Sequence, residues 1–551
     1  MRLLPFYFLS FLFLINFSPV QSQLFAPAKT FSRSDTLRGS LSKARTWWDV
    51  QHYTILVEPD FANKSITGKV DILFTVKEIY DTMQIDLQHP MELTKAYLGD
   101  DALEYKRDGN VYHLIINKKL NIGTEVKLAL AFSGKVREAT RPPWDGGWIF
   151  TKDRNGNPWM SVACQGLGAS VWYPCKDHQS DEPDKGATLR ISVPDSLTAV
   201  GNGRCIGKNT YKNGWTVYDW EVKNPINNYN IVPYIGKYVS FKERYKGQKG
   251  DLDCEYWVLD YELEKAREQF KQVPLMLKAF EHWFGPYPFY EDGYKLVQSP
   301  HLGMEHQSAV AYGNGFQNGY RGRDLSGSGF GLKWDFIIVH ESGHEWFGNN
   351  ITSNDLADMW LHEGFSNYSE TLFTDYYFGK EAGNAYVQGT RKLIRNDTPI
   401  IGRYGVNDEG SGDMYYKGGN LLHYLRQLFD DDEKFRSALR EMNRVFYHKT
   451  VTSDQIEHFL SVKAGRDLRP LFDQYLRNTS IPTLELQEVN NEIKFRWADC
   501  IETFNIPVKI ETGNKTKWIY PTTNWKSLNE PLSLSAVSID KNFYVGMRIL
   551  N

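Results

Sequence analysis

Residues 334–350 read WDFIIVHESGHEWFGNN, and this stretch decides how the central part of the chain is understood. It lies in a run of helical patterns. His340 and His344 are four residues apart, so on a helix both imidazoles lie on one face, with Glu341 beside them. Histidines at this spacing also arise by accident. The spacing therefore suggests a metal site but does not establish one by itself.

The stretch 358–365, DMWLHEGF, opens the next helical run, and eighteen residues separate its Glu363 from His344. In this the chain resembles the aminopeptidase N family of zinc metallopeptidases (gluzincins), which includes leukotriene hydrolase and has HExxH, eighteen residues and then Glu within W-L-x-E-G-F. The resemblance implies that His340, His344 and Glu363 hold one catalytic Zn²⁺. We do not expect His362 to be a ligand, because its side chain projects about 100° away from that of Glu363.

The predicted ligand set determines the chemistry. Zinc held by two histidines and a carboxylate lowers the pKa of its bound water from about 16 towards about 7. Glu341 lies where a carboxylate can take the proton of that water and pass it to the leaving amine. The resemblance extends to Tyr415-Tyr416-Lys417-Gly418, which is similar to the family's Y-x-K-G. It implies that Tyr415 stabilises the tetrahedral intermediate; the alternative is a packed core aromatic.

A further motif distinguishes an exopeptidase from an endopeptidase. Residues 301–306 read HLGMEH and resemble the family's G-x-M-E-N. The resemblance implies that Glu305 binds the free α-amino group of a peptide, and that Gly303 and Met304 contact the substrate. Leu302 and His306 depart from the family pattern, which leaves the shape of the pocket open. His306 is either a new pocket residue or a structural one.

A local match in the first part of the chain points to one more substrate residue. Gln165 precedes WYPCKD at residues 172–177 at the distance seen in leukotriene hydrolase. By resemblance, Gln165 approaches the N-terminal residue of the peptide. The alternative is a buried glutamine of a β domain.

The hydrophobic periodicity divides the chain into parts. Two-residue alternation, as in residues 70–76 and 126–132, predicts a β domain over 47–245. Helical spacing follows over 246–481, with a kink expected at Pro274. Alternation returns over 482–551. We predict a multidomain α+β fold with a small C-terminal β domain. The resemblance implies a saddle-like first domain and a thermolysin-like, mainly helical catalytic domain.

The N-terminus predicts export. Residues 1–22 combine Arg2, an apolar stretch and small residues near Ser22, which is typical of a cleaved signal peptide. The alternative is an uncleaved anchor. Residues 23–46 are predicted to be a linker. The formal net charge of −3 gives no electrostatic reason to expect nucleic acid or an anionic membrane as a partner. An odd count of five cysteines leaves at least one thiol unpaired.

We therefore predict an exported zinc aminopeptidase that acts on peptides with a free N-terminus. One alternative is a zinc endopeptidase or another hydrolase, such as one acting on epoxides. Another is a binding protein with an inert zinc site. Because about 70 residues with strand-like alternation follow Arg477, where larger family members have a long helical domain, we expect an open active-site cleft.

Overall fold

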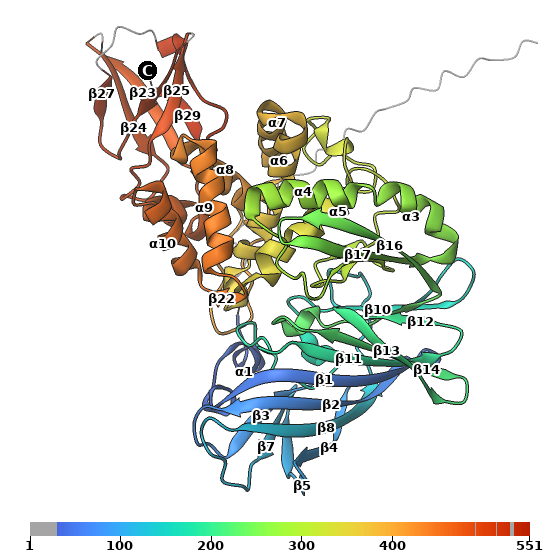
Figure 1. Ribbon diagram of the computed structural model, residues 1–551. Helices are drawn as coiled ribbons and strands as arrows, with labels where there is room; N and C mark the ends of the chain where they lie inside the picture. Colours follow the sequence, from blue (N-terminus) through green and yellow to red (C-terminus); the bar gives the residue numbers. More distant parts are fainter. Residues whose placement is uncertain (1–29, 491, 514, 529–533, 551) are drawn as a thin grey trace, which may run out of the picture.

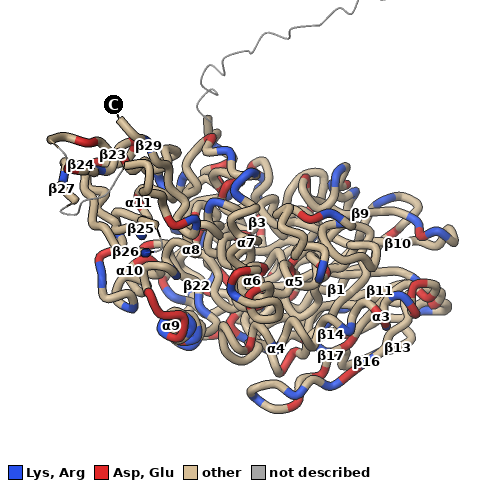
Figure 2. Tube along the Cα trace, turned by 90° about the horizontal axis from the view of Figure 1, so that it is seen from above, with Lys and Arg blue, Asp and Glu red and all other residues tan. Residues whose placement is uncertain are grey.

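The computed structural model describes residues 30–490, 492–513, 515–528 and 534–550. The predicted signal peptide lies outside these residues. Figure 1 shows a β-rich first part, a mainly helical middle and a small β region at the C-terminal end. The predicted α+β fold class is confirmed. Lysine and arginine are interspersed with aspartate and glutamate along the chain (Figure 2).

The first part is built on a large sheet whose central strand is β1 (Trp48–Asp60). Tyr53, Ile55 and Val57 are fully buried and alternate with half-buried residues, as expected for a strand with one face on the core. The neighbours of β1 are β2, antiparallel, and β11, parallel. In the described part of the chain the strand order is β13 (Arg204–Lys212), β14 (Trp215–Val222), β11 (Ala187–Pro194), β1, β2 (Ser65–Val76), β8 (Glu125–Lys135), β4 (Glu92–Leu98) and β5 (Asp101–Ala102).

Two smaller sheets complete the first part. The sheet that leads towards the middle of the molecule consists of β12 (Thr198–Val200), β15 (Tyr234–Gly236), β10 (Pro158–Ala163) and β9 (Gly147–Lys152). The other consists of β3 (Thr82–Asp86), β7 (Val111–Ile115) and β6 (Tyr105–Asp108). The loop after β10 carries Gln165.

The middle part places helices against a mixed five-stranded sheet. The sheet order is β16 (Tyr238–Gly247), β17 (Gly250–Leu259), β18 (Tyr294–Gln298), β20 (Val310–Tyr312) and β19 (Gly303–Met304). The predicted boundary between residues 245 and 246 falls inside β16, which pairs along its length with β17. The short strands β21 (Ile351–Ser353) and β22 (Lys449–Val451) pair in parallel.

The helices of the middle part pack around α6, whose first fifteen residues are all buried. Where a kink at Pro274 was expected, the chain forms two helices that separate at Phe270 and Lys271. The α-helices of this part are α3 (Leu263–Gln269), α4 (Gln272–Phe284), α5 (Phe336–Gly343), α6 (Trp360–Phe378), α7 (Lys380–Thr390), α8 (Tyr416–Phe429), α9 (Asp432–Val445), α10 (Ser453–Ala464) and α11 (Arg469–Arg477).

The C-terminal region forms two small sheets. Its core residues, among them Leu484, Trp497 and Phe543, belong to the same hydrophobic cluster as the helices of the middle part. The sheets contain β27 (Lys526–Leu528), β24 (Glu492–Ala498), β23 (Thr483–Val489) and β29 (Gly546–Leu550), and β26 (Lys515–Ile519), β25 (Val508–Thr512) and β28 (Val537–Ile539).

Two further features bear on the sequence predictions. All five cysteines are free thiols. Within the described ranges, no helix combines the length and the apolar character needed to cross a membrane.

Candidate metal centre and active site

The two histidines come from the C-terminal end of α5. Asp335 caps the start of this helix by accepting hydrogen bonds from the backbone N–H groups of Ile337 and Ile338, at 3.1 and 3.3 Å. Every residue of α5 is buried. His340 and His344 lie one turn apart with ring centroids separated by 5.1 Å. The cap and the apolar packing therefore fix both imidazoles on one face.

Glu363, in the first turn of α6, meets the two imidazoles. Its Oε2 lies 3.7 Å from His340 Nε2 and 3.3 Å from His344 Nε2. Burial raises the pKa of this carboxyl, but the two imidazoles beside it outweigh burial and hold the pKa below its ordinary value. Glu363 is therefore an ionised carboxylate, and three groups from two helices converge on one point.

The outer ring nitrogens fix the orientation of the imidazoles. His340 Nδ1 donates to Glu370 Oε1 at 2.7 Å, and His344 Nδ1 donates to the Phe347 carbonyl oxygen at 3.1 Å. Glu370 in turn accepts from Asn367 Nδ2 and from the Tyr386 hydroxyl. With Nδ1 protonated in both rings, both Nε2 lone pairs face Glu363, which is the arrangement that metal ligands require.

The donor set fits zinc. Glu363 Oε2 is buried without a hydrogen-bond donor among the described residues, although it faces two Nε2 atoms. Two imidazole nitrogens and one carboxylate oxygen form a three-ligand set that leaves one coordination position for water. A Glu341 oxygen also lies within 4.8 Å of both imidazole nitrogens. Glu363 Oε2 lies within 3.7 Å of both nitrogens, so Glu363 is the candidate ligand and Glu341 the candidate free carboxylate.

Glu341 stands beside this centre in an environment that suits proton transfer. Burial raises its pKa to about 7, although His340 and His344 act in the opposite direction. Gly303 lies against its carboxylate: a Cβ atom at position 303 would come within 2.5 Å of Glu341 Oε1. Glycine at this position therefore lets the strand β19 approach the carboxylate.

Glu305 follows β19 and is held from two sides. The Tyr229 hydroxyl donates to Glu305 Oε1 at 2.8 Å, and Asn349 Nδ2 donates to the Glu305 backbone oxygen at 2.8 Å. Asn230 in turn donates to Asn349 Oδ1. Burial raises the pKa of Glu305. Of its two carboxylate oxygens, Oε1 is engaged by Tyr229.

Gln165 and Tyr415 approach the centre from opposite ends of the sequence. Gln165 Nε2 donates to Glu363 Oε1 at 3.2 Å, so a loop of the first part contacts a predicted metal ligand. The Tyr415 ring stacks on the His340 ring with centroids 6.1 Å apart. Burial raises the pKa of Tyr415 well above its ordinary value. Its hydroxyl therefore keeps its proton and can donate it in a hydrogen bond.

One cavity of about 640 Å³ is lined by all nine residues predicted from the sequence: Gln165, Gly303, Met304, Glu305, His340, Glu341, His344, Glu363 and Tyr415. No described residue after Tyr416 lines it. A second cavity, of about 890 Å³, lies beside α9 and contains none of the nine. The candidate site is therefore identified by the residues that line the cavity and not by the cavity's volume.

The two further histidines considered in the sequence do not line this cavity. His306 is buried, and its Nδ1 lies 2.6 Å from the Tyr234 hydroxyl. His362 Nε2 accepts from the Ser353 backbone N–H at 2.8 Å, so that nitrogen is not available to a metal. Both residues are therefore buried outside the cavity. Leu302, the other departure from the family motif, does line the cavity.

Sequence reasoning missed several residues at this site. Tyr229 and Asn349, which hold Glu305, give no local sign in the sequence. Glu370 lies seven residues after Glu363 on the same helix, and a carboxylate at that spacing could have been found as an outer partner. The cavity is also lined by Trp144, a residue that is 67% exposed.

Comparison with known proteins agrees with the geometry. The Peptidase M1 N-terminal domain model matches residues 49–229, and the Peptidase family M1 domain model matches residues 331–475. Leukotriene A-4 hydrolase of Xenopus laevis is 23% identical over 75% of this chain and 68% of its own length. Human aminopeptidase B is 26% identical over 61% of this chain and 52% of its own length. The chain thus spans about half the length of some curated relatives.

Solved structures show the same fold. An M1 zinc metallopeptidase from Deinococcus radiodurans, crystallised as a variant with a Tyr-Ser-Ala substrate, superimposes with a TM-score of 0.65 at 21% identity. The match covers 80% of this chain and 96% of that one. The conclusion rests on three observations. Two family models match the β-rich and helical parts, the fold agrees, and two histidines and a carboxylate form a buried centre. The chain belongs to peptidase family M1 and is a zinc metallopeptidase.

Proposed function

We propose that this chain is an aminopeptidase that removes the N-terminal residue of peptides. The observation that carries the proposal is the position of Glu305: a buried carboxylate, held by Tyr229 and Asn349, lines the same cavity as the metal centre. A carboxylate there can bind a free α-ammonium group through charge-assisted hydrogen bonds. Binding of the ammonium at that point would bring the first peptide bond to the metal centre. The aminopeptidases among the relatives support this proposal.

In the proposed hydrolysis, each of these residues has a separate role. A zinc ion held by His340, His344 and Glu363 would supply a water of lowered pKa and polarise the peptide carbonyl. Glu341 accepts the proton of the attacking water and returns it to the leaving amine. The Tyr415 hydroxyl donates a hydrogen bond to the carbonyl oxygen as negative charge develops there.

The test is a panel of aminoacyl amides, assayed with and without a chelator, together with one peptide in free and N-acetylated forms. We expect hydrolysis that the chelator abolishes and that acetylation suppresses. Glu305→Gln should lower kcat/KM for free peptides by about 10- to 100-fold, because a neutral amide replaces the charged partner of the ammonium. Undiminished cleavage of the acetylated peptide would favour an endopeptidase. Failure of the zinc-loaded protein to cleave any member of the panel would reject the proposal.

We also propose that the chain is exported and that the segment 1–22 is removed as a signal peptide. The support is the sequence pattern alone. N-terminal sequencing of the secreted or periplasmic protein tests it: a first residue near Gln23 is expected, and a mature chain that begins at Met1 contradicts it.

A further inference from the structure

Two short helices precede the large sheet and lie ahead of the part matched by the first family model. They are α1 (Arg33–Gly39) and α2 (Lys43–Thr46), in the segment predicted to be a linker. Ser32 caps α1 through a capping box with Asp35. The segment therefore has defined structure where a connecting stretch was expected.

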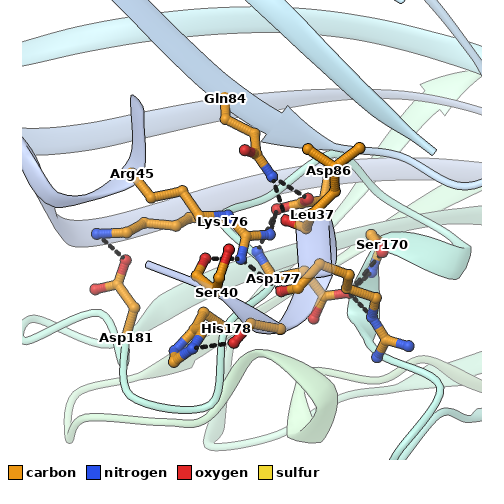
Figure 3. A network of polar contacts seen from close by, with 12 residues as sticks. Leu37, Ser40, Arg45, Gln84, Asp86, Ser170, Lys176, Asp177, His178 and Asp181 are labelled. Atoms are coloured by element: carbon orange, nitrogen blue, oxygen red, sulfur yellow. Dashed lines mark hydrogen bonds and ion pairs between the residues drawn. The ribbon is translucent and has the colours of Figure 1, made fainter. Parts of the chain in front are cut away.

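The C-terminal end of α1 is fixed by side chains from the rest of the first part (Figure 3). Four successive carbonyl oxygens, those of residues 37–40, all lie within hydrogen-bond distance of side-chain nitrogens. Gln84 donates to the first, Arg45 to the second and fourth, and the His178 ring contacts the third. Carbonyl groups that a helix end leaves free are thus satisfied, so α1 cannot shift without breaking several hydrogen bonds.

Arg38 projects from this fixed end to the loop after β10. Its Nη2 donates to the Gly166 carbonyl oxygen at 2.8 Å, and its Nε lies 3.7 Å from Asp177 Oδ2. Asp177 is already bound by the backbone N–H and hydroxyl of Ser170. Among the described residues, Gly166 O is the only hydrogen-bond partner of the Arg38 side chain. The main contact of this arginine is therefore with the loop.

The residue before Gly166 is Gln165, which reaches the metal centre. Gln165 Nε2 donates to Glu363 Oε1 at 3.2 Å. Two hydrogen bonds on adjacent residues thus connect α1 with a zinc ligand. The distance in sequence is large, since Gln165 lies 127 positions after Arg38 and Glu363 lies 198 positions after Gln165.

The same end of α1 also contacts a second loop of the cavity. A Cβ atom at Gly39 would lie 2.6 Å from the backbone nitrogens of Val406 and Asn407. Asn407 itself lines the cavity. Glycine at position 39 therefore allows α1 to pack directly against this loop.

We propose that Arg38 is a positioning residue for substrate binding, which anchors the loop that places Gln165 beside Glu363. The proposal rests on the aminopeptidase function proposed above, because Gln165 acts on the substrate only in that role. Nothing in the sequence around Arg38 indicates this connection, and the segment lies outside both family-model matches.

The variants Arg38→Gln and Arg33→Gln test the proposal. Arg33 lies on the same helix but pairs with Asp108 and is 70% exposed, so it serves as the matched control. Arg38→Gln should raise KM for an aminoacyl amide by about tenfold and leave kcat unchanged, as expected for a residue that orients a substrate-binding group. Arg33→Gln should change neither. Arg38→Lys keeps the charge and should give the same pattern with a smaller rise, should the glutamine variant fail to fold.

A second measurement does not depend on activity. Hydrogen exchange of the backbone amides at 164–170 should become faster in Arg38→Gln and stay unchanged in Arg33→Gln. In a double-mutant cycle, Arg38→Gln should add nothing to the KM of Gln165→Ala. Additive effects or unchanged exchange would overturn the proposal. If the wild-type protein cleaves no aminoacyl substrate, the proposed function fails, and exchange at 164–170 alone decides whether Arg38 anchors the loop.

Discussion

At the scale of single residues, three buried glutamates beside one metal centre differ in their partners. Glu363 faces two imidazole nitrogens, Glu305 is bound by a tyrosine hydroxyl, and Glu341 stands next to both imidazoles without being the closest carboxylate. Burial disfavours the charge on all three, and the neighbours decide how far each departs from an ordinary carboxyl group. The same type of side chain therefore stands in three different environments, which fit the proposed roles of ligand for Glu363, amine partner for Glu305 and base for Glu341.

Replacing the base gives the most direct prediction. Glu341→Gln removes the proposed proton acceptor but leaves the three proposed ligands, so kcat should fall by about 10²- to 10⁴-fold with zinc content unchanged. The measurement is the initial rate on an aminoacyl amide, combined with metal analysis of the same sample. Glu264→Gln, an exposed position on α3, is the control. A variant that keeps near wild-type kcat would assign the proton transfer to another group.

Variants of the adjacent Tyr415 and Tyr416 test whether the Tyr415 hydroxyl takes part in the reaction or only packs. Tyr415→Phe removes the hydrogen-bond donor, so kcat should fall by about 10²- to 10³-fold with little change in KM. Tyr416→Phe, one residue further along the wall of the same cavity, should change kcat by less than about fivefold, because it removes no donor to the developing oxyanion. Steady-state kinetics of both variants check this. The reverse order of effects would reject the assignment of Tyr415.

At the scale of elements, the candidate metal centre is formed by the helices α5 and α6 and by the non-helical residues between them. α5 ends at Gly343, and beyond it Phe347 leaves helical geometry with φ −129° and ψ 100°. The carbonyl oxygen of Phe347 can then accept from His344 Nδ1. α6 supplies Glu363, Asn367 and Glu370 at positions i, i+4 and i+7, so ligand and outer partners share one face.

The outer carboxylate on α6 should control metal affinity. Glu370→Gln weakens the acceptor for His340 Nδ1, so zinc affinity should fall by about 10- to 100-fold. Competition with a fluorescent chelator measures this without any substrate. Glu381→Gln, exposed on the next helix, should bind zinc like the wild type. Equal affinities of the Glu370 variant and the wild type would show that His340 needs no outer partner.

At the scale of the whole molecule, the C-terminal region is joined to the helical part through a common core. His423, on α8, is completely buried at this junction. Its Nδ1 lies 3.0 Å from the Tyr368 hydroxyl on α6, and its Nε2 lies 3.0 Å from Asn542 Oδ1 in the C-terminal region. The neutral ring, with Nε2 protonated, satisfies both partners. Burial, reinforced by nearby arginines, lowers the pKa of His423 to about 3.

Stability should therefore decrease in mild acid. The pKa of His423 is lower in the folded than in the unfolded chain, so the unfolded chain binds the extra proton first. Its contribution is fully present above pH about 6.5 and is lost as the pH falls from there to about 3. His423→Gln removes the imidazole that takes up this proton on unfolding. The slope of unfolding free energy against pH should therefore decrease by about 1.4 kcal/mol per pH unit within that range.

Denaturant unfolding at several pH values measures the slope. Tyr368→Phe is the control, because it removes the hydrogen bond between Tyr368 and His423 and keeps the imidazole. It should lower stability at every pH and retain the wild-type slope. If the His423 variant also retains that slope, the proton uptake in this range belongs to other groups, such as the partly buried His178.

Some differences between prediction and structure have simple local causes. Pro274 does not kink a long helix; it lies in the first turn of α4, where its missing N–H costs no helical hydrogen bond. The boundary predicted at residue 245 falls inside β16 because a two-residue period shows that a segment is a strand but not which sheet it joins.

The sequence by itself determined the order of strand-rich and helical parts, and its resemblance to a known family supplied the nine candidate site residues. Periodicity acts over neighbouring residues and family motifs keep fixed spacings, so both can be read along the chain. Only the tertiary structure decided that Tyr229 holds Glu305 and that Arg38 reaches the loop of Gln165. Both are single hydrogen bonds between segments distant in the chain. Such bonds form only after packing has brought the elements together, and they impose no spacing or periodicity on the sequence.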